Sequence, residues 1–155
     1  MKKILFFLII NLLLLNGCAN KVTSYRSPDF KTNDYHSLYV IHQPKDDKKI
    51  NILIKKEFEK RGYKVNTGDK KNTPKKVDGV ITYIDKWMWD ITMYMIELTI
   101  TMHKPPSDYP TAKGYSMHTS LTRLSPNEMV EEVVANMLGE KPVQKKEKEN
   151  EDSEF

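Results

Sequence analysis

The sequence predicts an α/β (α+β) domain, a two-layer sandwich of order β-α-β-β-β-α in which two helices cover one face of a mixed five-stranded sheet. Three observations lead to this fold class. A helical period lies between two short apolar runs, a period of two then extends over three longer segments, and a helix-start signal follows them. About 100 residues carry these patterns, which is enough for one domain with one core.

The first half predicts a strand, a helix and a second strand. Residues 37–41, SLYVI, are of strand type, and residues 63–65 resume an extended run. Residues 46–61 between them have a helical period, with Asp46 or Asp47 as the expected cap. The apolar residues on one face of this helix are Ile50, Leu53, Ile54 and Phe58. A unit of this kind predicts two parallel strands joined by a right-handed crossover.

The second half predicts three strands and a helix. Strands are expected over about 80–89, 93–103 and 112–123, where the apolar period is two. The segment SPNE at 125–128 then supplies a capping serine, a proline at the first helical position and a glutamate three residues after the serine. The apolar stripe of this helix is Met129, Val130, Val133, Val134, Met137 and Leu138, and Gly139 ends it.

Strand registers follow from keeping apolar side chains on one face of the sheet. With an even loop around 90–91, the predicted pairs of the first hairpin are Trp87–Tyr94, Tyr83–Leu98 and Ile81–Ile100. The predicted pairs of the second hairpin are Tyr94–Leu121, Leu98–Met117 and Ile100–Tyr115. Registers two residues away keep the same faces in the second hairpin, so they remain alternatives.

The opposite face of this sheet is predicted to carry a polar row of Lys86, Glu97 and His118. A row of this kind on a solvated sheet is common and contributes roughly 0.2–1 kcal/mol per pair, so we interpret it as structural. The chain has no G-x-S-x-G, no H-E-x-x-H and no glycine-rich phosphate loop, and its four histidines lack metal-ligand spacing. The sequence therefore predicts no catalytic residue, no metal and no cofactor, and a protein that is not an enzyme.

The segment DKWMWD, residues 85–90, places Asp85, Trp87 and Trp89 on the predicted core face and Asp90 at the turn. The two aspartates are five positions apart, which sends them to opposite faces of a regular strand and makes them a poor catalytic pair. Asp85 is a charge on an apolar face. We expect a hydrogen bond to a helix or loop amide, and the alternative is a functional role.

A candidate partner or ligand surface lies around the same hairpin. Met88 and Met93 are predicted at its end, and Met95 continues the same face. Flexible apolar side chains that no third layer covers are typical of partner surfaces. The alternative is an aromatic groove for a lipid or glycan, lined by Trp87, Trp89 and Tyr94.

The first 18 residues predict export and lipidation. Residues 1–17 have two lysines followed by an apolar run too short to span a bilayer comfortably, as in a secretory signal peptide. The chain has one cysteine, Cys18, and the segment LNGC at 15–18 resembles the lipobox of bacterial lipoproteins, with Asn16 in place of the usual smaller residue. The resemblance implies cleavage before Cys18, a thioether from its sulfur to diacylglycerol and a lipidated new N-terminus, which together form a membrane anchor.

The flanks of the domain and its charge complete the predicted organisation. Residues 18–36 are expected to be the lipid anchor and a flexible tether, 37–139 the sandwich domain and 140–155 a disordered charged tail. Without residues 1–17 the chain keeps 23 basic and 21 acidic residues, so charge gives no reason to expect a nucleic-acid partner. Ala19 after the cysteine implies, by the sorting rule of enteric lipoproteins, the periplasmic face of the outer membrane. Because that rule varies among bacteria, the inner membrane is the alternative.

The segment YIDKWMWDITMY, residues 83–94, matches the pattern Y-x-x-x-W-x-W-D-x-x-x-Y. It resembles the signature of a group of small, uncharacterised Gram-negative lipoproteins. The predicted strand order resembles, in fold only, the N-terminal domain of TolB and LptE-like lipoproteins. These resemblances imply location and fold rather than activity.

The leading hypothesis is a non-enzymatic envelope interaction or assembly module that binds an envelope protein, in an unknown oligomeric state. The alternative hypothesis is a lipid or glycan binder, and a hydrolase using Asp85, Glu97 and His118 is a third.

Overall fold

The computed structural model describes residues 20–140. The predicted signal peptide (1–17), the predicted lipidation site Cys18 and residues 141–155 of the predicted tail lie outside the described residues. Within the described part of the chain, no helix is both long enough and apolar enough to cross a membrane.

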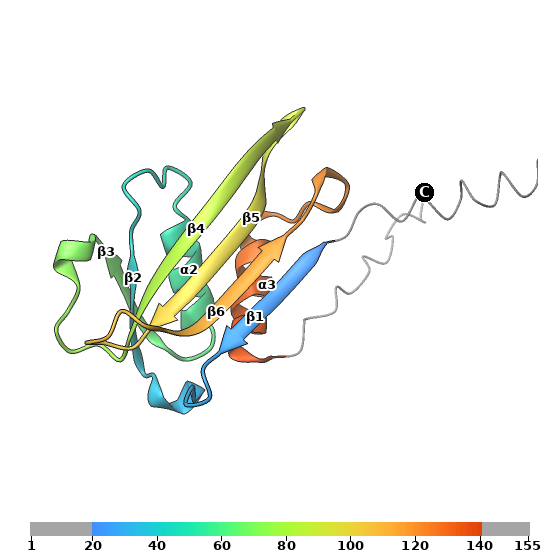
Figure 1. The fold of residues 1–155 in the computed structure, drawn as a ribbon. Coiled ribbons are helices and arrows are strands. Elements are labelled where there is room, and N and C mark those ends of the chain that lie inside the picture. Colours follow the sequence, from blue (N-terminus) through green and yellow to red (C-terminus); the bar gives the residue numbers. More distant parts are fainter. Residues whose placement is uncertain (1–19, 141–155) are drawn as a thin grey trace, which may run out of the picture.

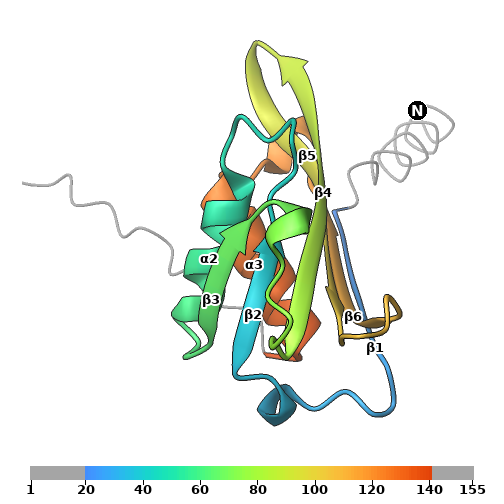
Figure 2. The same cartoon turned by 90° about the vertical axis from the view of Figure 1, so that its left-hand side faces the viewer.

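The described residues form a two-layer sandwich of one mixed sheet and two helices, which confirms the predicted fold class. The elements are β1 (Lys21–Arg26), η1 (Thr32–Asp34), β2 (Ser37–Ile41), α2 (Ile50–Glu59), β3 (Lys64–Gly68), η2 (Lys70–Asn72), β4 (Gly79–Asp90), β5 (Thr92–His103), β6 (Pro110–Met117), η3 (Ser120–Thr122) and α3 (Pro126–Leu138). The strand order is β1-β6-β5-β4-β2-β3, and both helices cover the same face of the sheet (Figures 1 and 2).

The sheet has six strands rather than the predicted five, because residues 21–26 of the predicted tether form β1. This strand pairs antiparallel with β6 along its whole length. All six of its residues are exposed, so β1 has no apolar stripe that the sequence analysis could have recognised. The Arg26 guanidinium also donates to the carbonyl oxygens of Asn136 (3.0 Å) and Met137 (3.3 Å), which ties the end of β1 to the C-terminal end of α3.

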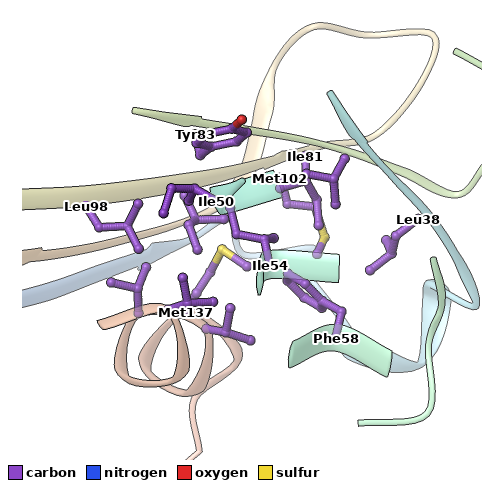
Figure 3. Packing of buried hydrophobic residues seen from close by; sticks show 14 of the residues in the cluster. Leu38, Ile50, Ile54, Phe58, Ile81, Tyr83, Leu98, Met102 and Met137 are labelled. Carbon is purple, nitrogen blue, oxygen red and sulfur yellow. The ribbon is translucent and has the colours of Figure 1, made fainter. Parts of the chain in front are cut away.

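The predicted strand-helix-strand unit is confirmed as β2, α2 and β3. The two strands run parallel, with Leu38 opposite Val65, and β4 is parallel to β2 on its other side. In the helix, Ile50, Ile54 and Phe58 are fully buried against the sheet. Figure 3 shows these side chains interleaved with those of the strands and of α3. Burying one such side chain contributes about 1.5–3 kcal/mol, and this shared core fixes both helices on the sheet.

The helix α2 begins at Ile50, with Lys49 rather than Asp46 or Asp47 at its N-cap position, so the predicted cap is wrong. Asp46 nevertheless organises the start of α2. Its Oδ2 accepts from the Asn51 amide (3.1 Å) and from the Tyr83 hydroxyl (2.7 Å), and its Oδ1 is buried without a hydrogen-bond partner. Burial alone would raise the pKa of Asp46. The Tyr83 hydroxyl and the helix amides outweigh that effect and hold the pKa below its usual range. Asp46 thereby links the first turn of α2 to the centre of β4.

The predicted registers of both hairpins are wrong. In the first hairpin Tyr83 pairs with Ile100 and Lys86 with Glu97, but beyond a bulge Trp87 pairs with Met95 and Trp89 with Met93. Ile91 alone forms the apex, where two residues were predicted, and this shifts the pairing of β4 with β5 by one position. Ile96 pairs with no residue of β4, and this bulge shifts the pairing by one further position.

The second hairpin differs from the prediction by one residue, which turns β6 over. The observed pairs are Leu98–Ser116, Ile100–Gly114 and Met102–Ala112, and β6 ends at Met117, well before the predicted 123. This shift turns the small residues Ala112, Gly114 and Ser116 toward the helices. Their size lets α3 pack directly on β6. A Cβ at Gly114 would lie 2.6 Å from the Val133 carbonyl oxygen and 2.9 Å from Val133 Cγ1. The bulkier Tyr115 and Met117, predicted in the core, lie on the other face.

Replacing Gly114 by Ala tests this close approach. The added methyl group meets helix backbone, which cannot move aside locally, so we expect a loss of about 1–3 kcal/mol in the free energy of unfolding, measured with urea. The exposed neighbour gives the control, because Lys113→Ala should change stability by less than about 0.5 kcal/mol. Equal stability of the two variants would contradict the packing.

Asp46→Asn tests the charge at the start of α2. At neutral pH we expect a loss of about 1–3 kcal/mol. Because the pKa of Asp46 is lowered on folding, its contribution is present above the unfolded pKa and disappears as pH falls through the folded pKa. The stability difference between wild type and variant should therefore shrink between pH 5 and pH 2, a range set by roughly the ordinary carboxyl pKa. Asp47→Asn, on an exposed neighbour, should be nearly neutral throughout.

Candidate interaction surface

The predicted polar row is only partly present. Lys86 Nζ and Glu97 Oε2 form an ion pair at 2.8 Å on the open face of the sheet, and the Glu97 carboxylate raises the pKa of Lys86. His118 is not in this row. Glu97 lies opposite Met117 instead, because of the one-residue shift in the second hairpin. The three side chains are thus not assembled into a site.

His118 is buried and links the end of β6 to α3. Its Nε2 lies 2.8 Å from Glu132 Oε1, and its Nδ1 lies 3.0 Å from the Thr122 carbonyl oxygen. The Ser116 hydroxyl donates to the same Glu132 oxygen. Serine and histidine both contact the carboxylate, and both ring nitrogens of His118 have partners. This cluster therefore holds α3 against the sheet, and the Ser116 and His118 side chains are buried, away from any substrate in solvent.

Asp85 is bonded to a side chain rather than to the predicted helix or loop amide. The Trp87 indole N–H donates to Asp85 Oδ2 at 2.5 Å. Trp87 packs against the core, and Lys48 Nζ lies 5.8 Å from the centre of its ring. One hydrogen bond thus satisfies the indole N–H and engages one oxygen of the carboxylate, two neighbouring polar groups on the helix-facing side of β4.

Two residues of the predicted partner surface are buried. Met95 is a full member of the core, because the bulge at Ile96 turns it toward the helices. Tyr94 is also buried. It pairs with Met88, its hydroxyl contacts the Met88 sulfur at 3.5 Å, and the Arg123 guanidinium stacks 4.8 Å from its ring centre.

The predicted aromatic groove is not formed. Trp87 pairs with Met95 and Tyr94 with the adjacent Met88, so the ring of Trp87 and the ring of Tyr94 lie on opposite faces of the β4–β5 ribbon. Trp89 is on the same face as Trp87, but it lies close to the hairpin apex and is exposed. The alternative ligand site therefore loses the geometry on which it was based.

Met88, Trp89 and Met93 of the predicted surface form part of an exposed apolar group at the end of the β4–β5 hairpin, whereas Trp87 packs against the core. Two residues join them that the sequence analysis did not select, Ile91 at the apex and Leu121 in η3. We call these five residues the hairpin-end cluster. Their exposed fractions are 47% for Met88, 70% for Trp89, 84% for Ile91, 53% for Met93 and 84% for Leu121.

Hydrogen bonds hold η3 beside the hairpin end. The Ser120 hydroxyl donates to Asp90, and the Arg123 guanidinium donates to the Thr92 hydroxyl at 2.8 Å. The Thr122 hydroxyl donates in turn to the side chain of Asn20, the first described residue. Figure 1 shows the start of β1, the η3 loop and the hairpin apex at the same end of the molecule. Asn20 therefore lies at the end that carries the hairpin-end cluster.

A pocket of about 490 Å³ lies at the opposite end of the sheet, between the β3–β4 and β5–β6 loops and the strand ends beside them. Its lining is mostly apolar, and its polar residues include Lys70, Lys75 and His103. His103 is already bonded, through Nε2 to the Thr82 hydroxyl (3.1 Å) and through Nδ1 to the Asp108 carbonyl oxygen (2.8 Å). Among residues 20–140 no group of three or more His, Cys, Asp or Glu side chains is arranged to hold a metal ion.

Comparison with known proteins gives the fold alone. No protein-family model matches the chain, and no curated protein does. Solved structures that share the fold include two PelC dodecamers from Paraburkholderia phytofirmans, one of them a point variant. The variant is 11% identical with a TM-score of 0.56, and the other is 9% identical with a TM-score of 0.57. The match covers 79% of this chain and 98% and 100% of the PelC chains.

The two tryptophans should differ in solvent access, since Trp89 is exposed and Trp87 is packed. With Trp87→Phe the remaining Trp89 should emit at long wavelength and be quenched strongly by acrylamide. With Trp89→Phe the remaining Trp87 should emit at shorter wavelength and have a quenching constant several-fold smaller. Similar constants in the two variants would contradict the placement of the hairpin end.

Proposed function

We propose that this chain is a lipid-anchored envelope protein and acts as a non-enzymatic assembly module. Cys18 carries the anchor, on the periplasmic face of the outer membrane, and the domain of residues 20–140 presents interaction surfaces to its surroundings. The observation that carries the membrane part of the proposal is the hairpin-end cluster. Five large apolar side chains are gathered at one end of a small domain, beside the residue that follows the predicted lipid attachment site by two positions. An exposed apolar group of this kind is typical of an interaction site.

The chemistry of the polar groups supports a role without catalysis. Asp85 bonds Trp87, Asp46 bonds Tyr83 and the start of α2, and Glu132 bonds His118 and Ser116. Each of these charged or titratable groups is used to join two parts of the fold. A catalytic acid or base needs instead to face a substrate with its proton position free.

Assembly of several copies is supported by the open edge of β1 and by the description of the PelC structures as dodecamers. The Ser27 amide donates to the Thr111 carbonyl oxygen of the β6 side (2.9 Å). By the alternation of an antiparallel pair, the amides of Tyr25 and Thr23 also face β6, and that of Ser24 faces outward. Within residues 20–140 no strand pairs with the outer side of β1, and an edge strand of this kind is a template for pairing with another strand, here one from a second copy.

The lipidated protein, extracted from membranes in mild detergent, tests the proposal. Mass spectrometry should find Cys18 acylated, and light scattering after gel filtration should give a mass several times that of one chain. Ser24→Pro removes one outward amide and should reduce the assembled mass, whereas Ser24→Ala should not. Thermal unfolding of both variants checks that the fold survives. A monomeric wild type would overturn assembly, and an unmodified Cys18 would overturn the anchor.

A further inference from the structure

We propose that the hairpin-end cluster is a second membrane contact, which inserts into the lipid surface that holds the anchor. The inference rests on the proposed lipidation of Cys18 and names the partner of the exposed apolar surface. Its occupant is the lipid bilayer itself rather than another protein. Four observations carry it. The cluster and Asn20 lie at the same end of the domain, and the hairpin extends farther than the anchor can. The apex residue is Ile91, and the charges beside the cluster nearly cancel.

The reach of the hairpin follows from the strand registers. Lys21 lies opposite Met117, Met117 opposite Glu97, and Glu97 opposite Lys86, so these four residues form one row across the sheet. Ile91 at the apex is five residues beyond Lys86, which corresponds to about 16 Å along the strand direction.

The anchor cannot extend as far as the apex. Cys18 is three residues before Lys21, so it lies at most about 11 Å from that residue, however the chain between them runs. With the strands upright on the membrane, the apex is therefore about 5 Å deeper than the farthest position open to Cys18. Interfacial apolar groups typically enter the boundary between headgroups and acyl chains by roughly 5–10 Å. A depth difference of about 5 Å is within this range, so when Cys18 lies at the membrane surface, Ile91 lies at the boundary between headgroups and acyl chains.

Ile91 is an unfavourable residue for the apex of a water-exposed hairpin. Its φ is 59°, in the left-handed region that glycine and asparagine adopt with less strain. A β-branched residue there is strained, and it exposes a large apolar side chain as well. Neither cost benefits the fold. Both are offset when the side chain leaves water for lipid, and the neighbouring Trp89 has the amphipathic ring that is enriched at membrane interfaces.

Two ion pairs lie next to the cluster. Lys86 pairs with Glu97 at 2.8 Å, and Arg123 lies 3.9 Å from Asp90. Because these charges nearly cancel, the contact is apolar in character rather than an attraction to anionic headgroups. Binding by the hairpin end should therefore depend little on salt, in contrast to a polybasic patch.

Quenching by brominated lipids measures the insertion directly. The full lipidated protein with Trp87→Phe, in which Trp89 is the remaining tryptophan, is reconstituted into vesicles of phosphatidylethanolamine and phosphatidylglycerol with brominated acyl chains. A matched control carries Trp87→Phe, Trp89→Phe and Tyr109→Trp, which moves the tryptophan to an exposed site in the β5–β6 loop at the other end. We expect at least about a twofold loss of emission for Trp89, because it lies at acyl-chain depth, and almost none for the control.

A second pair of variants separates insertion from folding. Ile91→Asn suits the left-handed apex and removes the apolar side chain, so it should leave the unfolding temperature equal or higher while reducing the quenching of Trp89. Ile84→Asn changes an exposed isoleucine of the same strand on the open face of the sheet, and should leave the quenching unchanged.

Vesicle flotation distinguishes the two proposals. If the protein does not float with the vesicles, the anchor fails and this inference fails with it. If it floats but Trp89 is quenched no more than the control tryptophan, the inference alone is overturned. Protection of Trp89 from both brominated lipid and aqueous iodide would also overturn it, in favour of a protein that covers the cluster.

Discussion

The difference in rise between strand and helix determines the shape of this domain. The strands β4 and β5 have 12 residues each, which gives each a length of about 40 Å. The helices α2 and α3 have 10 and 13 residues, and the longer one extends only about 20 Å. Two such helices cannot cover the whole length of the hairpin. The core therefore occupies one half of the ribbon, and the apex projects beyond the helical layer, as Figure 1 shows.

Along the part of the ribbon that the helices cover, the bulge at Ile96 determines which apolar side chains face the core. It turns Met95 toward the helices, where it is fully buried, and restores the face that the single-residue apex would otherwise have reversed. Trp87 is the last residue of β4 that packs on the core, and its indole N–H donates to Asp85 at that boundary. Beyond it, Trp89 and Met93 lie on the helix-facing side of the ribbon with no helix above them. Their exposure is a consequence of strand length rather than of a polar environment.

Local signals in the sequence predicted the local structure well. The capping box of Ser125 and Glu128, the proline at the first position of α3 and the left-handed Gly139 are all present, and the crossover unit is parallel as expected. Predictions that depended on counting apolar residues across strands were less successful. Gly114 faces the helices because α3 needs the space, although the neighbouring Tyr115 is the more apolar residue. That error placed His118 on the wrong face. The strand β1 gave no signal because all of its residues are exposed. A comparison of strand and helix lengths would have indicated that the hairpin end is uncovered, and with it Ile91.

The exposed end and the proposed anchor come together because β1 begins beside η3, which the hairpin holds through Ser120 and Arg123. The most direct test of the account is a photo-reactive amino acid in place of Ile91, activated in intact cells, with the crosslinked products identified by mass spectrometry. The same residue in place of Tyr109 is the control. The account predicts phospholipid adducts at position 91 and none at position 109. A single protein adduct at position 91, without lipid, would contradict it.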